Sequence, residues 1–429
     1  MSRLGRALCM AACLSLAFTS QAQAGAAWFY EQGTPDQGTS AAGRAALAKD
    51  ASTAWGNPAG MTYLNQTQFL IGAGAMVLQT EFETEPGTTE SGGGHNLTSA
   101  LPMITGHFVY NVSPDFKLGL AVNPLMGAVA DYGDTYAGRY YVQREALLTL
   151  SFNPVAAYRI TDWLSVGGGF SVVGAYLSGK SAFNNLDPAL RDGRVEMYSL
   201  TVGFGGNFGV LVEPWKGTRL GATYRTPVNL TFHDVVQSVR GLGPGATFIL
   251  DVLGQRLDVP RGSKVDLTLT NPQQVMVSVY HELTQRLAVM GNFDWEDWSD
   301  FGHIGVTIHG TNTRNSVTNI HWSDTYHWAA GAQYRIGEPW LVSAGFAYDT
   351  SPVVEGRRTV VLAIDRQFRY SAGVQYQLSK DLTVGAAYTL IDLGDAPFNT
   401  DGGVARGTLV GHYQPNFAHV IGFNLGKKF

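Results

Sequence analysis

Residues 368–378 read Phe-Arg-Tyr-Ser-Ala-Gly-Val-Gln-Tyr-Gln-Leu, and this stretch decides the fold class of the chain. One alternating set of positions is apolar or aromatic, namely Phe368, Tyr370, Ala372, Val374, Tyr376 and Leu378. The other set is polar or small, namely Arg369, Ser371, Gly373, Gln375 and Gln377. A period of two indicates a β-strand with one apolar and one polar face. Aromatic rings near both ends of the apolar face are typical of strands that cross a membrane.

The same alternation recurs elsewhere in the chain. The apolar positions are Trp340, Val342, Ala344, Phe346 and Tyr348 in one stretch, and Ile421, Phe423, Leu425 and Phe429 in the C-terminal one. We expect Phe429 to end the last strand with its ring toward lipid, because it continues this apolar face. A soluble β-sandwich also alternates, but its apolar face need not carry aromatic rings at both ends.

The composition supports a membrane barrel. Charged residues make up 15% of the chain, compared with roughly 25% in ordinary soluble domains. The mean hydropathy is −0.02, with 52 glycines, 19 tyrosines and 21 phenylalanines. Past the N-terminal segment the sequence has no apolar run of about 18 residues, so membrane-spanning helices are not expected. An apolar lipid face and a polar lumen face together average to neutral hydropathy.

Residues 1–24 predict a secretory signal peptide. Arg3 and Arg6 give a positive start, residues 7–18 form a short apolar stretch, and Ala22-Gln23-Ala24 offers small residues for cleavage. The apolar stretch is too short to act as a stable membrane anchor. We therefore expect cleavage after Ala24.

Both cysteines, Cys9 and Cys13, lie inside this signal segment. A lipoprotein signal ending before Cys13 is the alternative, although its apolar core would be unusually short. Removal of the signal peptide leaves no cysteine, so disulfides and thiolate chemistry are not expected. The formal net charge of −5 becomes more negative when Arg3 and Arg6 are lost, which argues against nucleic acid as a partner.

Fourteen strands are predicted after residue 66. We place them at 68–82, 103–111, 118–123, 147–160, 164–178, 196–212, 219–231, 265–282, 287–302, 322–336, 340–348, 366–378, 382–390 and 419–429. The connections between them alternate strictly between short and long. An even strand count with short periplasmic turns and long outer loops indicates an outer-membrane β-barrel with both ends in the periplasm.

The segment 25–66 does not alternate. It is rich in Gly, Ala and Ser and contains Asn57-Pro58-Ala59-Gly60. A fourteen-stranded barrel encloses more space than its own side chains fill. We therefore divide the chain into a signal peptide (1–24), a small N-terminal hatch that plugs the lumen (25–66) and the barrel (67–429). A periplasmic tail is the alternative for residues 25–66.

The stretch 43–61 resembles the N-terminal hatch of the FadL/TodX (OmpP1) family of outer-membrane transporters for hydrophobic compounds. Its residues 48–55, Ala-Lys-Asp-Ala-Ser-Thr-Ala-Trp, lead into Asn57-Pro58-Ala59-Gly60-Met61. Four more segments are similar to that family in the same order, namely 137–140, 153–159, 295–301 and 347–352. The resemblance implies a fourteen-stranded barrel plugged by a small helical hatch.

The resemblance also implies passive transport of hydrophobic molecules, with long-chain fatty acids as the expected ligands. Lipopolysaccharide covers the outer leaflet with polar saccharide, and a sixteen-carbon chain in water costs about 12 kcal/mol, at about 0.8 kcal/mol per methylene. The resemblance further implies that the ligand is captured by outer loops and transferred to a pocket above the hatch. It then leaves sideways through a wall gap beside a kinked third strand.

Apolar side chains in two predicted outer loops are candidates for the capture step. They are Phe183, Leu186 and Leu190 in one loop, and Phe248, Ile249, Leu250 and Leu253 in the next. A purely solvated loop would not carry such a cluster. The alternative is a small private core that stiffens the loops.

Three cations are candidates for a carboxylate head group. Lys180 lies at the mouth of the strand 164–178, and Arg139 and Arg144 lie in the preceding loop. Lys180 could equally be an ordinary surface lysine. The two arginines could instead bind lipopolysaccharide phosphates or a carboxylate of the wall.

Asn123-Pro124, with Gly127 close behind, is the expected site of the wall gap. Proline lacks the N–H that a ladder needs, so pairing should lapse there. Asn57, Pro58 and Ala59 should form a fixed turn of the hatch lodged against the wall. We expect a kink or bulge at Asn123-Pro124, with the hatch near Asn57 approaching the same stretch of wall.

One departure from the family keeps the ligand open. Fatty-acid members use two basic residues deep in the barrel, whereas residues 295–310 contain His303 and His309 but no lysine or arginine. Aromatic hydrocarbons of the toluene type are therefore the alternative ligand.

Other classes find little support. The sequence has no Gly-x-Ser-x-Gly and no His-Glu-x-x-His motif, and its histidines lack metal-ligand spacing. We expect no enzyme activity, no cofactor and no metal; a hydrophilic porin and a lipid hydrolase are lesser alternatives. The expected partners are a hydrophobic ligand, outer-membrane lipid and lipopolysaccharide, and the barrel-assembly machinery. The barrel itself should be monomeric.

Overall fold

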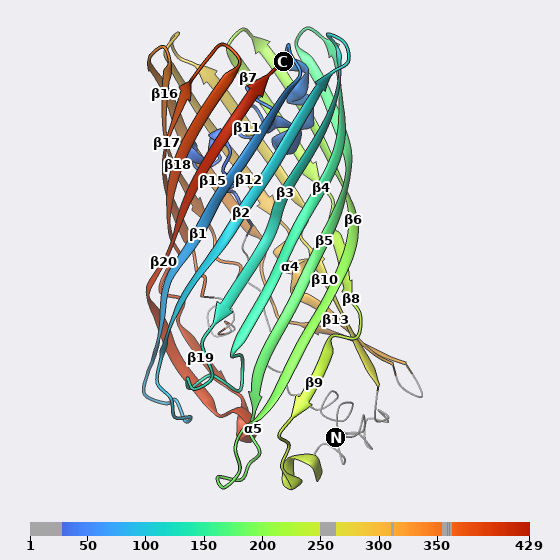
Figure 1. Cartoon of the computed structure of the whole chain (residues 1–429), viewed down its shortest axis with the longest axis vertical. Coiled ribbons are helices and arrows are strands. Elements are labelled where there is room, and N and C mark those ends of the chain that lie inside the picture. The colour runs from blue at the N-terminus through green and yellow to red at the C-terminus, as the bar shows by residue number, and fades with distance from the viewer. Residues whose placement is uncertain (1–27, 249–262, 310–312, 354–357, 359, 361–362) are drawn as a thin grey trace.

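The computed structural model describes residues 28–429, apart from 249–262, 310–312, 354–357, 359 and 361–362. The predicted signal peptide lies outside the described residues, as do Ile249, Leu250 and Leu253. The architecture is a tall barrel of slanted antiparallel strands, with the N-terminal segment inside one half of it (Figure 1). None of the helices in the described ranges is long and apolar enough to span a bilayer.

Fourteen strands form the wall. In pairing order they are β1 (Gln68–Thr84), β2 (His95–Asn111), β3 (Phe116–Asp131), β4 (Arg144–Thr161), β5 (Leu164–Phe183), β6 (Gly193–Trp215), β7 (Thr218–Arg225), β11 (Gln274–Glu282), β12 (Leu287–Glu296), β15 (Thr325–Gly337), β16 (Trp340–Asp349), β17 (Gln367–Gln377), β18 (Leu382–Asp392) and β20 (Thr408–Lys428). The sheet closes because β20 pairs with both β18 and β1. The predicted fold class, a fourteen-stranded antiparallel barrel, is confirmed.

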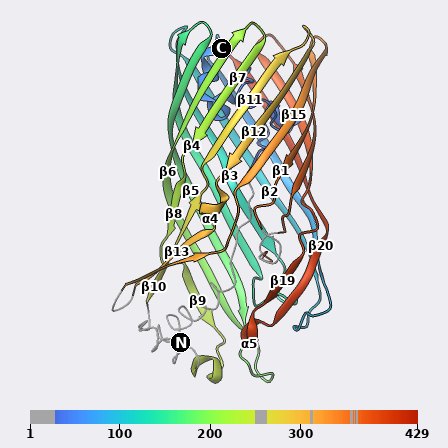
Figure 2. The ribbon, with the colours of Figure 1, turned by 180° about the vertical axis from the view of Figure 1, so that it is seen from behind.

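Further strands extend the wall at the end with long loops. β9 (Val236–Arg240) pairs with β6, and β19 (Phe398–Asp401) pairs with β20. A separate four-stranded sheet, visible at the lower left in Figure 2, consists of β8 (Val228–Phe232), β10 (Lys264–Asn271), β13 (His303–His309) and β14 (Arg314–Asn319). Of two short helices, α5 (Gly403–Arg406) lies at this end, and α4 (Trp298–Phe301) lies about halfway along the molecule beside β10.

Some predicted strands prove to be two elements. The stretch 219–231 divides into β7 and β8 around Pro227, and 265–282 divides into β10 and β11 around Pro272. The last wall residues on either side, Arg225 and Gln274, lie opposite each other in the β7–β11 ladder. Because proline cannot donate to a ladder, the chain leaves the wall at both points and enters the separate sheet. The predicted strand 287–302 likewise ends at Glu296.

Residues 28–66 line the inside of the barrel at the end with short turns (Figure 1). They contain three short turns, η1 (Pro35–Thr39), α2 (Thr53–Gly56) and η2 (Pro58–Tyr63). A Cβ added to Gly345 of β16 would come within 2.1 Å of the Thr39 carbonyl carbon, and one on Gly221 of β7 within 1.9 Å of the Ala45 oxygen. Small residues in the segment and glycines in the wall therefore allow backbone to pack on backbone.

Asn57 fixes one turn of this segment. Its Nδ2 donates to the Ala45 oxygen at 2.6 Å and to the Val210 oxygen of β6 at 3.0 Å, while its Oδ1 accepts from the Ala59 N–H. Pro58 and Ala59 lie against Gly167 of β5. The Asn57 amide itself is engaged by β6, whereas its neighbours Ala54 and Met61 lie against Gly119 of β3, four residues before Asn123.

Candidate functional site

Strands β2 and β3 stop pairing partway along their length. Their ladder runs from Asn111↔Lys117 to Gly106↔Val122. Beyond this point β2 continues only against β1, and β3 continues against β4 as far as Asp131. The strand predicted at 118–123 is thus longer than expected. Residues 95–105 of β2 and 123–131 of β3 therefore do not pair with each other among the described residues. We call this interval between the two strands the wall split.

Pro124 lies at the start of the split. It offers no N–H, and the register of β3 against β4 shifts between Pro124 and Gly127. Thr149 of β4 compensates at the bulge: its hydroxyl oxygen accepts from the Met126 N–H at 2.8 Å and lies 2.7 Å from the Met126 oxygen. The irregularity is therefore built into the sequence and satisfied by side chains.

The N-terminal segment occupies the inner side of the split. The Phe29 N–H donates to the Leu125 oxygen at 3.3 Å, and Trp28 forms an isolated bridge with Met126. Gln32 connects both strands, because its backbone oxygen accepts from Thr105 of β2 at 2.9 Å and its side-chain Nε2 donates to the Pro124 oxygen at 3.2 Å.

The side-chain amide of Asn123 adds to these contacts between the N-terminal segment and the wall split. Its Nδ2 donates to the Gln32 side-chain oxygen and lies 3.1 Å from Nε2 of His107. Asn123, Gln32 and His107 are all buried. The N-terminal segment thus satisfies the Pro124 and Leu125 carbonyls of β3, which lowers the cost of unpaired backbone groups facing lipid.

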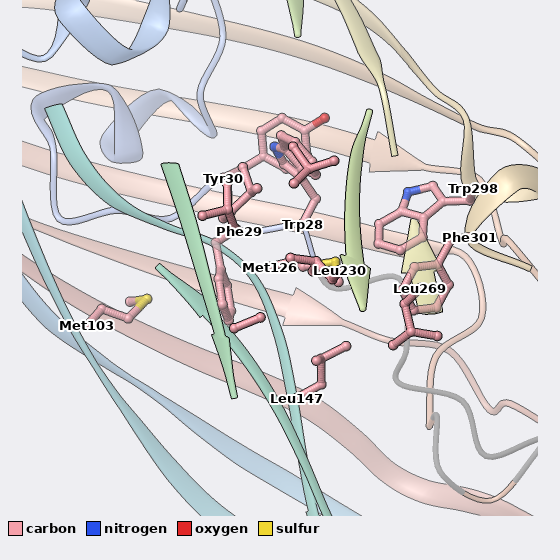
Figure 3. Close-up of a cluster of buried hydrophobic side chains, with 14 of the residues drawn as sticks. Trp28, Phe29, Tyr30, Met103, Met126, Leu147, Leu230, Leu269, Trp298 and Phe301 are labelled. Carbon is pink, nitrogen blue, oxygen red and sulfur yellow. The ribbon is translucent and has the colours of Figure 1, made fainter. Parts of the chain in front are cut away.

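An apolar cavity adjoins the wall split. Its empty volume is about 800 Å³, including the part open to solvent. It is lined by Trp28, Phe29, Met76, Leu78, Thr80, Leu97, Leu101, Gly127, Ala128, Val129, Ala130, Ala363, Ile364, Gln367, Arg369, Ile391, Leu393 and Ala418. Figure 3 shows Trp28 and Phe29 within the cluster of buried side chains that includes Met126 and Leu147. Leu97 and Leu101 come from one side of the split, and residues 127–130 come from the other.

Arg369 of β17 is a cation at this cavity, and it is fully occupied. Its Nη1 donates to both carboxylate oxygens of Glu31, at 2.7 and 2.8 Å, and its Nε donates to Asp349 at 2.8 Å. Nη2 donates to Gln367 at 2.9 Å. Arg369, Glu31 and Asp349 are buried. The N-terminal segment is therefore tied to the wall by a buried ion pair.

The neighbouring Tyr30 adds a second tie. Its ring stacks on His327 at a centroid distance of 4.0 Å. Its hydroxyl lies 2.8 Å from Asp294 and 2.7 Å from Glu296 of β12. Burial raises the pKa of Tyr30 well above its ordinary value, so the hydroxyl keeps its proton and remains a donor.

A family model described as outer membrane protein transport protein (OMPP1/FadL/TodX) matches residues 15–429. The chain belongs to this family. It is an outer-membrane β-barrel of a Gram-negative bacterium and a transporter of hydrophobic compounds. Family members are transport channels rather than enzymes.

Relatives and solved structures agree with this membership. A long-chain fatty acid transport protein of Escherichia coli O6:H1 is 27% identical over 82% of this chain and 83% of its own length. Outer membrane protein P1 of Haemophilus influenzae is 25% identical over 95% and 96%. A Pseudomonas aeruginosa FadL homologue superposes with a TM-score of 0.80 at 19% identity, covering 94% of this chain and 99% of that one. The Ralstonia pickettii toluene transporter TbuX gives 0.60 at 18% identity, covering 92% and 97%. At these identities, the two superpositions show a shared fold and nothing about the ligand.

The three cations singled out for a head group in this family member lie near the long loops. Each is paired with a carboxylate: Lys180 with Asp134 at 2.6 Å, Arg139 with Asp192 at 2.9 Å, and Arg144 with Asp131 at 2.9 Å. None of the three lines the apolar cavity. Arg369, unlike these three residues, lines the apolar cavity.

The two candidate capture loops meet at Asn185. Its Nδ2 donates to the Gly241 oxygen at 2.8 Å, and its Oδ1 accepts from the Gly243 N–H at 2.7 Å. Leu190 packs against Gly243. Leu186, Leu190 and Phe248 are exposed and Phe183 is half-buried. A small core that only stiffened the loops would bury these side chains, so their exposure argues against that alternative.

Sequence reasoning missed the residues that join the N-terminal segment to the wall. Arg369 carried a visible signal, since an arginine at a lumen-facing position of a membrane strand is a functional candidate. Glu31 and Gln32 gave no such signal. Acidic and amide residues are common in polar segments, and residues 25–66 were interpreted only from their small residues.

Proposed function

We propose that this chain carries long-chain fatty acids passively across the outer membrane, releasing them sideways into the bilayer through the wall split. The observation that carries the proposal is the position of the apolar cavity. Its wall includes Leu97 and Leu101 of β2 and residues 127–130 of β3, which are the two stretches that do not pair. A ligand in the cavity therefore lies directly behind an unpaired part of the wall.

Sideways release fits the energetics of an apolar ligand. Release into water would cost about 12 kcal/mol for a sixteen-carbon chain, at about 0.8 kcal/mol per methylene. A path through the split avoids this cost because the chain passes from apolar side chains into lipid. The path opens when Gln32 leaves Thr105 and Pro124, so movement of the N-terminal segment controls it.

The N-terminal segment, residues 25–66, acts in this proposal as the hatch. It is held by buried contacts at Arg369 and Tyr30, and its backbone lies against wall glycines. A barrel filled in this way should pass little ion current, which separates it from a hydrophilic porin. Its apolar ligand instead uses the cavity at the edge of the hatch.

Recognition of a carboxylate head group would involve Arg369. The guanidinium already holds Glu31, so a ligand carboxylate must replace Glu31 to reach it. This exchange would release the N-terminal segment and couple binding to opening. A neutral aromatic hydrocarbon, the alternative ligand, would leave the pair intact and use only the apolar lining.

Capture would begin at the two outer loops joined by Asn185. The exposed Leu186, Leu190 and Phe248 offer an apolar landing surface at the end of the barrel with long loops. Ile249, Leu250 and Leu253 follow in sequence and would enlarge it. Burial of each such side chain contributes about 1.5–3 kcal/mol when a ligand covers it fully.

A disulfide across the wall split tests the exit. Continuing the ladder past Gly106↔Val122 brings Thr105 opposite Asn123, so we would combine Thr105→Cys with Asn123→Cys. Both natural cysteines lie within residues 1–24. The control pair, Phe108→Cys with Leu120→Cys, bridges a register pair where the ladder is intact.

Uptake of radiolabelled oleate would be measured in cells that lack any other fatty-acid transporter. The split-bridged protein should lose uptake when oxidised and regain it on reduction, and the control pair should transport in both states. Normal uptake by the oxidised split-bridged protein would contradict lateral exit. Parallel binding measurements with palmitate and toluene would distinguish the two ligand classes.

A further inference from the structure

The lipid-facing side of β4, β5 and β6 ends in aromatic residues toward the long loops. Leu148, Tyr176 and Leu200 lie opposite one another in the ladders. Tyr198 follows, with its ring 5.6 Å from that of Tyr176. Leu200 is 62% exposed, so this row faces outward to lipid. Tyrosine rings gather at the membrane interface, which places the edge of the hydrocarbon layer here.

Beyond this edge the same outward face becomes charged, with Asp131, Arg144, Lys180 and Glu196 following one another across the ladders of β3, β4, β5 and β6. Arg144 of β4 lies opposite Lys180 of β5, four positions past the apolar row. Arg194 of β6 lies opposite Arg240 of β9, on the same face because alternate residues of a strand share it. Four residues of strand span about 13 Å. Arg194 lies six positions past Leu200, about 20 Å along the strand, so these charged residues stand at the depth of lipid head groups rather than of acyl chains.

The Arg194–Arg240 pair is unusual. Like charges directly opposite each other destabilise a strand pair, yet β9 joins the wall at this point. Arg194 approaches Asp134 at 3.6 Å and Glu196 at 3.9 Å, both of which are long contacts. In the described part of the chain, the Arg240 side chain has no acidic partner, and both arginines are exposed. An external anion would relieve the repulsion between them.

One nearby acid, Asp134, is already engaged by Lys180 and Arg194. The hydrogen bond from Lys180 holds the pKa of Asp134 below its ordinary value, and the charges of Lys180, Arg194 and Arg144 lower it further. Exposed ion pairs are weak, typically about 0–1 kcal/mol each. Arginine side chains in such pairs remain able to share their donors with a stronger anion.

We propose that Arg194 and Arg240 clamp a phosphate group of a phosphorylated glycolipid in the outer leaflet. Two guanidinium groups suit a phosphate because each presents planar paired donors to its oxygens. The lipid's acyl chains would lie against the apolar row below, which a free phosphate ion could not use. The proposal is independent of the transported ligand and of the exit route.

Such a clamp would also steady a capture loop. Arg240 directly precedes the segment 241–248, whose last residue is the exposed Phe248. β9 is held to β6 through only a short ladder, from Arg194↔Arg240 to Met197↔Val236. A phosphate that bridges β6 and β9 at Arg194 and Arg240 would hold the start of the segment 241–248 at the membrane surface.

Native mass spectrometry of the full purified chain in detergent, titrated with bisphosphorylated lipid A, tests the proposal. The double variant Arg194→Ala with Arg240→Ala should lower lipid A affinity at least about tenfold, since two charge-assisted contacts are lost. The matched control, Lys216→Ala with Lys380→Ala, removes the same charge from exposed turns at the opposite end and should bind as the wild type does. Lysine in place of both arginines should bind between the two, because charge remains but the fork is lost.

Three outcomes would overturn the proposal. The first is equal lipid A affinity in the alanine double variant and the wild type. The second is equal binding of lipid A from which the phosphates have been removed. The third is binding of inorganic phosphate as tightly as lipid A, which would indicate a free-anion site instead. Heat-modifiable migration in gels confirms that each variant is folded before titration.

Discussion

Arg369 in the barrel wall donates two hydrogen bonds to the Glu31 carboxylate of the N-terminal segment, at 2.7 and 2.8 Å, and both side chains are buried. A buried pair of this kind contributes less than its geometry suggests, since both charges lose water. Removing one partner is nevertheless costly, by about 3–5 kcal/mol, because the other charge stays buried. Asp349 lowers that cost here, as it shares the guanidinium. The pair is therefore suited to exchange one carboxylate for another.

Glu31→Gln should strengthen the binding of fatty acids. The change removes the anion that competes for Arg369 and leaves a neutral amide in its place. We expect palmitate affinity to rise about tenfold, equivalent to about 1.4 kcal/mol. Displacement of a fluorescent fatty acid from the purified protein would measure it.

Two controls test whether the effect of Glu31→Gln depends on the ligand's carboxylate and on this position. Methyl palmitate lacks the carboxylate and should bind the variant and the wild type equally. Glu81→Gln, on the exposed outer face of β1, should change nothing. Unaltered palmitate affinity in Glu31→Gln would mean that Arg369 does not receive the head group.

Much of the wall could be predicted from the sequence because its signals are local. Alternation within residues 368–378 needs no knowledge of the neighbouring strand, and the turns alternate in length along the chain. The breaks at Pro227 and Pro272 were readable in principle, since each proline interrupts an apparent strand. They were missed because apolar residues continue on both sides of each proline, in the separate sheet.

The site could be predicted only in part. Pro124 pointed to the irregular stretch of β3 because its missing donor is a property of one residue. The contact between Glu31 and Arg369 spans 338 positions and depends on barrel closure. The contact of Gln32 with Thr105 and Pro124 likewise arises only when three separate segments meet. No periodicity within a single segment carries such information.

Gly221→Ala should displace the hatch without unfolding the barrel. The new Cβ would come within 1.9 Å of the Ala45 oxygen, where backbone rather than a flexible side chain must yield. Overpacking of this kind costs about 1–3 kcal/mol. Ion current through single proteins in planar bilayers should therefore rise above the wild-type level.

Gly106→Ala is the matched control for Gly221→Ala. A Cβ on Gly106 of β2 meets no atom within 4 Å, so its conductance should remain that of the wild type. Equal conductance in both variants would show that the hatch does not depend on close contact at Ala45.

Serine at Phe248, Ile249 and Leu253 together should weaken uptake at low ligand concentration, because the apolar landing surface is lost. We expect the initial rate of oleate uptake to fall about tenfold there, which corresponds to about 1.4 kcal/mol, and to recover at saturating oleate. Val404→Ser, at a position 85% exposed near β19, removes apolar surface elsewhere at the same end and should transport normally. Unchanged kinetics in the triple variant would favour another entry route.

Deletion of Phe429 should impair assembly of the barrel rather than transport by protein that is already assembled. Phe429 follows β20 with its side chain 66% exposed and its ring 5.9 Å from that of Phe69 on β1. Its N–H donates to the Thr67 oxygen at 2.9 Å, so the residue joins the two strands that close the barrel. Loss of the ring removes an aromatic side chain from the lipid interface at that seam. Quantitative blots of outer-membrane fractions should show less folded protein, while the uptake rate per folded molecule stays at the wild-type value. Substitution by tyrosine should restore normal levels, since it keeps an interfacial ring, whereas wild-type amounts of the deleted form would contradict the assembly role.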